Sequence, residues 1–213
     1  MSAVELLREF VTLFVVIDPI GTLPIFAFAT QGVPVTRHRA IALRAVLVAG
    51  GVLIFFLVAG QIVLEAIGIS LASFRIAGGV VLFLFALTMI FGESKPEAEL
   101  AEAADAPGGA AMERAIFPLA MPSIASPGAM LAVVVLTDND RYNLAEQAVT
   151  LGLLIVVLAI TLGLLLAASW LNRQLGPSGS SVISRVMGII LAAVAVDAVL
   201  NALVDLGVPL TLS

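Results

Sequence analysis

The stretch from Phe10 to Thr30, FVTLFVVIDPIGTLPIFAFAT, is apolar along its length except at its proline-containing centre. Pro19 and Pro24 stand five residues apart in this centre. Proline inside a helix removes a hydrogen bond and clashes with the preceding turn, so the stretch predicts a broken helix. In lipid, such a break persists only where protein covers the freed backbone or where the backbone lines a cavity.

The same interval returns halfway down the chain. The segment Ala115–Thr137, AIFPLAMPSIASPGAMLAVVVLT, contains Pro122 and Pro127. Corresponding interrupted segments in the two halves of a membrane protein are a sequence indicator of a transport site. We therefore predict that the two breaks face each other near the middle of the membrane.

The composition indicates an integral membrane protein. The chain has 213 residues, of which 61% are hydrophobic and 12% charged, and its mean hydropathy is +1.17. Soluble domains carry about twice that share of charged residues. The formal net charge of −5 argues against a nucleic-acid partner. The absence of cysteine and the single histidine exclude thiolate and histidine-rich metal centres, and we predict no metal, no cofactor and no catalytic residue.

Six segments reach the length of about 20 residues that a helix needs to cross a bilayer. They are residues 10–31, 40–67, 73–91, 115–137, 145–171 and 184–206. We predict an all-α bundle of six transmembrane helices that forms a single domain over residues 1–213. The connection 93–114 is polar, alanine-rich and acidic, which is typical of a loop, and the topology places it in the cytoplasm.

Basic residues near the ends of the spans set the orientation of a membrane protein. With both termini outside the cytoplasm, the inner side holds Arg37, Arg39, Arg44, Lys95, Arg114, Arg173 and Arg185, and the outer side Arg8, Arg75 and Arg141. This excess of inner basic residues predicts external termini. Arg75 and Arg185 are expected to anchor their helices at the interface, with pairing to an acidic group as the alternative.

A duplication accounts for the order of the segments. The third and sixth segments both open with R-x-x-G, at Arg75–Gly78 and Arg185–Gly188. Each half, about 1–92 and 115–213, then holds a broken helix, an intact helix and an R-x-x-G helix. Because three spans is an odd number, the second copy enters the membrane from the opposite side, as an inverted repeat. Chance similarity between apolar segments is the alternative.

Two aspartates near the centres of spans are candidates for binding a coupling proton or cation. Asp18 lies in the first break and Asp197 in the sixth segment, where an ionised carboxylate costs at least ~2.5 kcal/mol. Asp18 also fits a structural role, because Asp before Pro19 suits the N-cap of the half-helix after the break. Asp197 and Asn201 form a polar stripe one helical turn apart, which suits either an interhelical hydrogen bond or a solute contact.

The breaks also offer groups for a small solute. Half-helix N-termini attract anions and unwound carbonyls bind cations, and a small zwitterion such as an amino acid carries both charges. Glycines at the breaks let a ligand approach the backbone. The predicted substrate-binding residues are Asp18, Pro19, Gly21, Thr22, Pro24, Pro122, Ser123, Ser126, Pro127, Gly128 and Asn201.

The motifs D-P-I-G-x-L-P at 18–24 and P-x-A-x-P-x-x-x-S-P-G at 118–128, with the R-x-x-G helices, resemble the MarC family of six-span membrane proteins. The resemblance implies a multi-pass protein of a prokaryotic plasma (inner) membrane. Related members are described as neutral amino acid transporters for glycine and alanine, coupled to ion or proton gradients. Two departures fall at the predicted site: Ser126 replaces the first glycine of the usual Gly-Pro-Gly, and Asp197 stands where an uncharged polar residue is expected.

Taken together, these features favour a secondary transporter of a small solute, a neutral amino acid above others, with proton or cation coupling. A membrane scaffold or partner subunit without transport activity remains open, as does drug or metabolite efflux, although one Trp and one Tyr give little support to a large aromatic cavity. An intramembrane aspartyl protease is disfavoured, because the chain lacks a G-x-G-D signature. We therefore do not expect an enzyme. The oligomeric state is left open.

Overall fold

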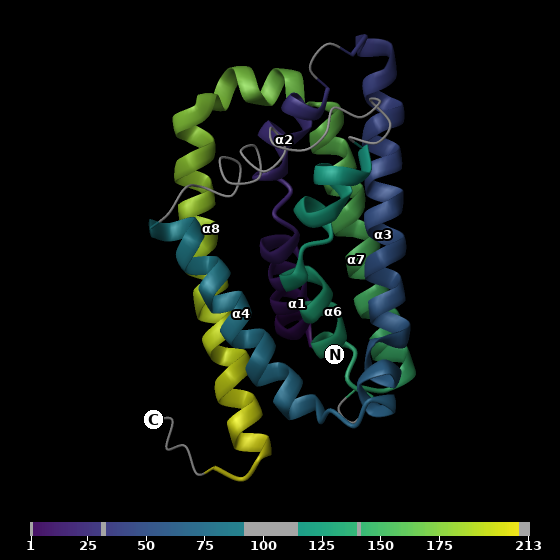
Figure 1. The fold of residues 1–213 in the computed structure, drawn as a ribbon, viewed down its shortest axis with the longest axis vertical. Coiled ribbons are helices and arrows are strands. Elements are labelled where there is room, and N and C mark those ends of the chain that lie inside the picture. Colours follow the sequence, from purple (N-terminus) through teal and green to yellow (C-terminus); the bar gives the residue numbers. More distant parts are fainter. Residues whose placement is uncertain (1, 31–32, 92–114, 140–141, 209–213) are drawn as a thin grey trace.

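The computed structural model describes residues 2–30, 33–91, 115–139 and 142–208, and its regular elements there are all helices (Figure 1). The elements are α1 (Ala3–Ile17), α2 (Thr22–Ala29), α3 (Val35–Ala66), α4 (Leu71–Phe91), the π-helix η1 (Ala115–Ile124), α6 (Pro127–Leu136), α7 (Leu144–Leu166) and α8 (Ala168–Asp205). The all-α prediction is confirmed for these residues. The predicted loop 93–114 lies outside them.

The first predicted break is confirmed, between Ile17 and Thr22. Asp18 has a φ of 49°, in the left-handed region, and its N–H closes the last turn of α1 on the carbonyl of Phe14. Asp18 is therefore the C-cap of α1, and its Oδ1 also accepts from the N–H of Gly21, the bond expected of the predicted N-cap for the turn that leads into α2. Pro24 does not break the chain. It is the third residue of α2, in the first helical turn, where a backbone N–H has no helical partner to lose.

The second predicted break is also confirmed, between Ile124 and Pro127. The wide π-helical turn ends where the N–H of Ala125 donates to the carbonyl of Ala120 at 2.9 Å. Ser126 is the N-cap of α6, and its hydroxyl accepts from the N–H of Ala129 at 3.1 Å. Pro127 then occupies the first helical position, which its fixed φ suits. Pro122 lies inside η1, so the chain breaks after this proline and not at it.

Four helices among the described residues are long and apolar enough to cross a membrane: Val35–Ala66, Leu71–Phe91, Leu144–Leu166 and the part Arg185–Asp205 of α8. α6 is apolar but shorter. These helices leave large apolar side chains on the outer surface, such as Leu47 and Val58, each 64% exposed. An apolar surface of this extent suits contact with lipid.

The broken helices lie inside the bundle. In Figure 1, α4 and α8 form a crossing pair on one side and α3 packs with α7 on the other, with the broken helices between them. Leu13 and Ile17 of α1 and Ile124 of η1 belong to the same buried cluster as the apolar side chains of α6. Both breaks are therefore covered by protein, as the bilayer requires of unwound backbone.

The start of α8 differs from the prediction. Two spans, 145–171 and 184–206, were expected with a connection between them, but α7 ends at Leu166 and one helix then runs from Ala168 to Asp205. Figure 1 shows that α8 changes direction before it runs along α4. Its first half contains Gly176, Pro177 and Gly179, residue types at which helices bend.

Glycines allow close contact where α4 and α8 cross. A Cβ on Gly79 would lie 3.0 Å from the carbonyl oxygen of Ala195. A Cβ on Gly188 would lie 3.1 Å from the carbonyl oxygen of Ala86. Along α4, Gly79 comes before Ala86, whereas their partners on α8 come in the reverse order, so the two helices cross in antiparallel directions.

Candidate functional site

The first break is built around the buried Asp18, which is 3% exposed. Its Oδ1 accepts from the N–H of Gly21 at 3.0 Å, and its carbonyl accepts from the Thr22 hydroxyl at 3.0 Å. The carboxylate thus folds over the turn between α1 and α2. Gly21 is needed there, because a Cβ at this position would lie 2.7 Å from Cγ of Asp18.

Two hydrogen bonds join the second break to the first. Ser123 Oγ donates to Thr22 Oγ1 at 3.1 Å, and Ser126 Oγ donates to the carbonyl of Val16 at 3.2 Å. The hydroxyl-bearing residues Thr22, Ser123 and Ser126 are all buried. The residues singled out in the two breaks, 101 and 110 positions apart in the sequence, therefore meet in one polar cluster inside an apolar bundle.

Other predicted residues lie at the edge of this cluster or away from it. Gly128 faces α4, where a Cβ would lie 2.5 Å from Cδ1 of Leu82. Pro19 is buried in the turn between α1 and α2, and Pro127 is exposed at the start of α6. Pro24 is a residue of α2 and Pro122 a residue of η1. Asp197 and Asn201 lie on α8 and make none of their recorded contacts with the breaks.

Asp197 forms an ion pair with Arg8 of α1, with side chains 51% and 68% exposed. The Asn201 amide donates to the carbonyl of Asp197 at 2.9 Å, so it bonds within its own helix. The polar stripe predicted on this helix therefore contacts α1 through the pairing of Asp197 with the guanidinium group of Arg8. Asp197 lies eight residues before the end of α8, about 12 Å along the helix axis.

Exchanging the two charges tests what the Arg8–Asp197 pair does. Exposed ion pairs contribute about 0–1 kcal/mol, so Arg8→Gln and Asp197→Asn should each leave thermal stability in detergent nearly unchanged. The double variant Arg8→Asp/Asp197→Arg should be as stable as the wild type. A large loss of stability in either single variant, recovered in the double variant, would show instead that the pair holds α1 against α8.

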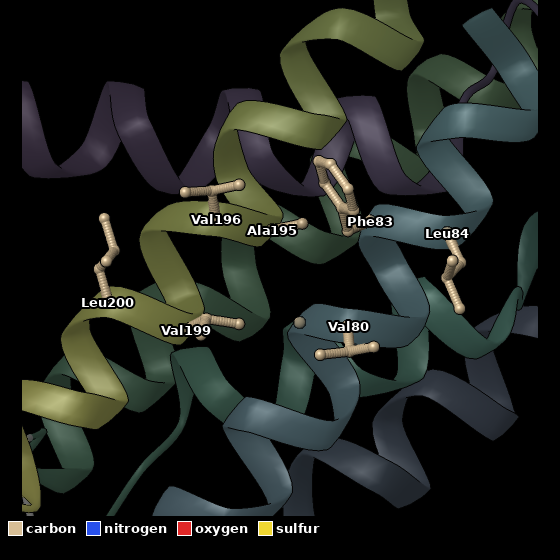
Figure 2. A pocket seen from close by; sticks show the side chains of 8 residues that line it. Val80, Phe83, Leu84, Ala195, Val196, Val199 and Leu200 are labelled. Atoms are coloured by element: carbon tan, nitrogen blue, oxygen red, sulfur yellow. The ribbon is translucent and has the colours of Figure 1, made fainter. Parts of the chain in front are cut away.

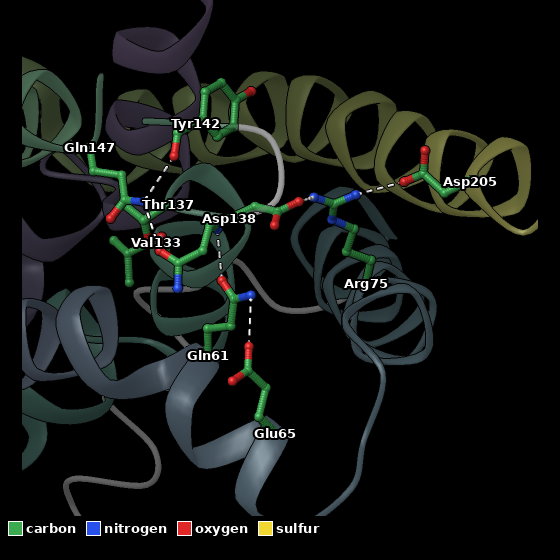
Figure 3. Close-up of polar contacts among 10 residues, drawn as sticks. Gln61, Glu65, Arg75, Val133, Thr137, Asp138, Tyr142, Gln147 and Asp205 are labelled. Atoms are coloured by element: carbon green, nitrogen blue, oxygen red, sulfur yellow. Dashed lines mark hydrogen bonds and ion pairs between the residues drawn. The ribbon is translucent and has the colours of Figure 1, made fainter. Parts of the chain in front are cut away.

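A buried ionic cluster occupies one end of the bundle (Figure 3). Arg75, at the start of α4, pairs with Asp138 just beyond α6 and with Asp205 at the end of α8, the latter at 2.8 Å. Arg75 is 4% exposed and Asp138 is 2% exposed. Of the two roles predicted for Arg75, the pairing with an acidic group is confirmed, and the role as an interfacial anchor stays a prediction. Arg185, its counterpart in the sequence repeat, is exposed.

Amide side chains extend this cluster across the end of the bundle. The N–H of Asn139 donates to Gln61 Oε1 at 2.8 Å, and Gln147 Nε2 donates to Asn139 Oδ1 at 2.8 Å. Gln61 in turn donates to Glu65 at 3.1 Å, and the Thr137 hydroxyl donates to the carbonyl of Leu57 at 3.2 Å. These contacts tie α3, α6 and α7 together (Figure 3).

Little in the amino-acid sequence indicates this cluster. Asp138 and Asp205 lie at the ends of apolar segments, where charged residues are ordinary. Their partner Arg75 is 63 and 130 residues away along the chain. The one available signal was the position of Arg75 at the start of an R-x-x-G helix, together with acidic residues at the ends of two other spans.

An open apolar groove of about 200 Å³ lies between α4 and α8 (Figure 2). Val80, Phe83, Val196 and Leu200 are among its lining residues, and none of the predicted site residues lines it. The groove offers no polar side chain to orient a zwitterion, so it does not serve as the candidate site.

The arrangement defines a class: a helical integral membrane protein with two interrupted helices that meet inside the bundle. The chain belongs to the MarC family of integral membrane proteins, which it matches over residues 3–206.

The relatives of the chain span nearly its whole length. The UPF0056 membrane protein of Archaeoglobus fulgidus is 33% identical over 197 residues, 92% of this chain and 91% of the relative. The UPF0056 membrane protein of Aquifex aeolicus is 32% identical, over 93% of this chain and 92% of the relative. The UPF0056 inner membrane protein YhgN of Escherichia coli is 32% identical, over 92% and 95%. No solved structure gives a significant match.

Proposed function

We propose that this protein is a secondary transporter of a small zwitterionic solute, a neutral amino acid such as glycine or alanine, with proton or cation coupling. The observation that carries the proposal is the contact between the two helix breaks through Ser123–Thr22 and Ser126–Val16. Paired interrupted helices supply free helix ends and carbonyls at one place, and these are the groups that bind carboxylates and cations in carriers.

The packing supports six spans arranged as two inverted repeats. Under this arrangement α1–α2 corresponds to η1–α6, α3 to α7, and α4 to the second part of α8. The helix contacts agree with this correspondence. The contact of α1 with α6 matches the contact of η1 with α2, and the contact of α4 with α6 matches the contact of α8 with α2. The antiparallel crossing of α4 and α8, with a glycine close to the opposite backbone on each helix, fits a two-fold axis in the membrane plane.

For localisation we propose the inner membrane of a prokaryote, with both termini outside the cytoplasm. The Escherichia coli relative is named an inner membrane protein. The excess of basic residues on the side that holds Arg37, Arg39 and Arg185 supports the orientation. In this orientation the Arg75 cluster lies at the external end of the bundle.

Asp18 and Asp197 are the two proposed ion-binding groups, and their surroundings favour Asp18. Its carboxylate is buried in the turn before α2, whereas the Asp197 carboxylate is half-exposed in its ion pair with Arg8. A buried carboxylate at an unwound segment offers a site for the ammonium group of the solute or for a coupling cation.

Uptake into proteoliposomes tests this proposal, with labelled glycine and alanine under imposed proton and sodium gradients. Asp18→Asn should abolish gradient-driven uptake while the protein still folds, because Asn tolerates the left-handed backbone and keeps an oxygen for the Gly21 N–H. Asp197→Asn is the matched comparison. Unchanged uptake in both variants would refute the ion-binding assignment. If the wild type moves neither amino acid, the chain is a membrane component without this transport activity.

A further inference from the structure

Glu9 is a buried carboxyl group that does not belong to the proposed transport site. It lies on α1, is 5% exposed, and shares its helix face with Leu13 and Ile17, which lead to the first break. Thr150 of α7 donates its hydroxyl to Glu9 Oε2 at 2.9 Å. In the described ranges 2–30, 33–91, 115–139 and 142–208, no basic side chain pairs with Glu9.

The charged groups around Glu9 do not compensate a negative charge on it. On α1, the neighbouring Arg8 is turned away into its ion pair with Asp197 of α8. Glu5, one turn earlier on the same face, and Glu146 at the start of α7 both repel a second carboxylate. Beyond the end of α6, Asp138 is committed to Arg75. The N-terminal amine favours the charged form of Glu9, but it acts less than Glu5 and Glu146 do against it, and Arg185 of α8 is exposed.

Burial of an ionised carboxylate without a cation is far less favourable than burial of the neutral acid. The neutral acid suits this position, since its carbonyl oxygen accepts from the Thr150 hydroxyl and its own O–H is a donor. We propose that the Glu9–Thr150 pair is a proton-binding site, separate from the helix breaks, in which Glu9 carries its proton in the arrangement described here.

The role of this proton site rests on the proposed transport function. A proton that binds Glu9 in one conformation and leaves it in another couples solute movement to a proton gradient. Asp18 is then left for the ammonium group of the solute. In this arrangement Glu9 of α1 serves coupling, and Asp18 in the break that follows α1 serves recognition of the solute.

Infrared spectroscopy of the purified full-length protein tests protonation without any transport assay. At neutral pH, the wild type should show a protonated carboxylic acid carbonyl band that Glu9→Gln removes and Thr150→Val shifts. Glu65→Gln is the control, since Glu65 is an exposed glutamate of α3, and it should leave this band unchanged. A wild-type spectrum identical to that of Glu9→Gln in this region would overturn the proposal.

Proteoliposomes then separate coupling from transport. Glu9→Gln should lose accumulation driven by a proton gradient and keep exchange of internal for external solute. Proton-driven accumulation at the wild-type rate in Glu9→Gln would overturn the coupling role. If the wild type transports no amino acid but loses the infrared band on Glu9→Gln, the proton site stands and the transport function fails, so the two failures are distinguishable.

Discussion

Arg75→Gln is expected to destabilise the protein by about 3–5 kcal/mol, because it removes the cation that pairs with the buried Asp138 and with the adjoining Asp205. The planar guanidinium reaches both carboxylates at once, through different nitrogens. A shorter or neutral side chain cannot do so. The effect should appear as a large fall in the thermal unfolding temperature in detergent.

Arg185→Gln is the matched control for Arg75→Gln. Arg185 opens the second R-x-x-G helix but is exposed, so its replacement should change stability little. The triple variant Arg75→Gln/Asp138→Asn/Asp205→Asn should regain much of the lost stability, since it removes the uncompensated charges with the cation. Equal effects of Arg75→Gln and Arg185→Gln would contradict the assignment of a buried cluster at one end only.

Gly21→Ala is expected to disrupt the first break. The added Cβ would lie 2.7 Å from Cγ of Asp18, and the carboxylate would be pushed out of its hydrogen bond with the Gly21 N–H. Overpacking of a buried site costs about 1–3 kcal/mol, and here it also displaces the proposed ion-binding group. We expect a lower unfolding temperature and loss of amino acid uptake.

Gly51→Ala provides the control for Gly21→Ala. Gly51 lies within α3, and a Cβ there would have no atom within 4 Å. Alanine in a helix interior is favoured over glycine by about 1 kcal/mol, so Gly51→Ala should raise stability. A destabilisation by Gly51→Ala as large as that of Gly21→Ala would mean that glycine-to-alanine changes act generally and not through Asp18.

Sequence reasoning could locate the breaks because proline and the bilayer constrain the backbone locally. It could not give their exact form. Asp18 takes a left-handed conformation and caps α1, whereas the pattern Asp18-Pro19 alone suggested the start of a helix. The hydrogen bond from Ser123 to Thr22 depends on how the two broken segments pack against each other. Only the correspondence of these segments in the proposed repeat suggested that they would be in contact.

The charged partners were the least predictable part. Arg8 and Asp197 are 189 residues apart, and nothing in either local sequence indicates the other. Glu9 stands just before the first apolar segment, where an acidic residue is usually solvated, so the sequence does not single it out. Its burial follows from the packing of α1 on α7, which periodicity alone does not specify.

The ionic cluster around Arg75 makes the two ends of the helix bundle different from each other. In the proposed repeat, Arg75 corresponds to Arg185, which is exposed, so the described residues of the second copy do not repeat the buried ion pair. Two conformations that the two-fold axis of the proposed repeat would interchange therefore differ in energy, although the backbone fold of both is the same. If the protein alternates between two such arrangements, as the proposed transport function requires, each 1.4 kcal/mol or so of that difference changes their relative populations about tenfold.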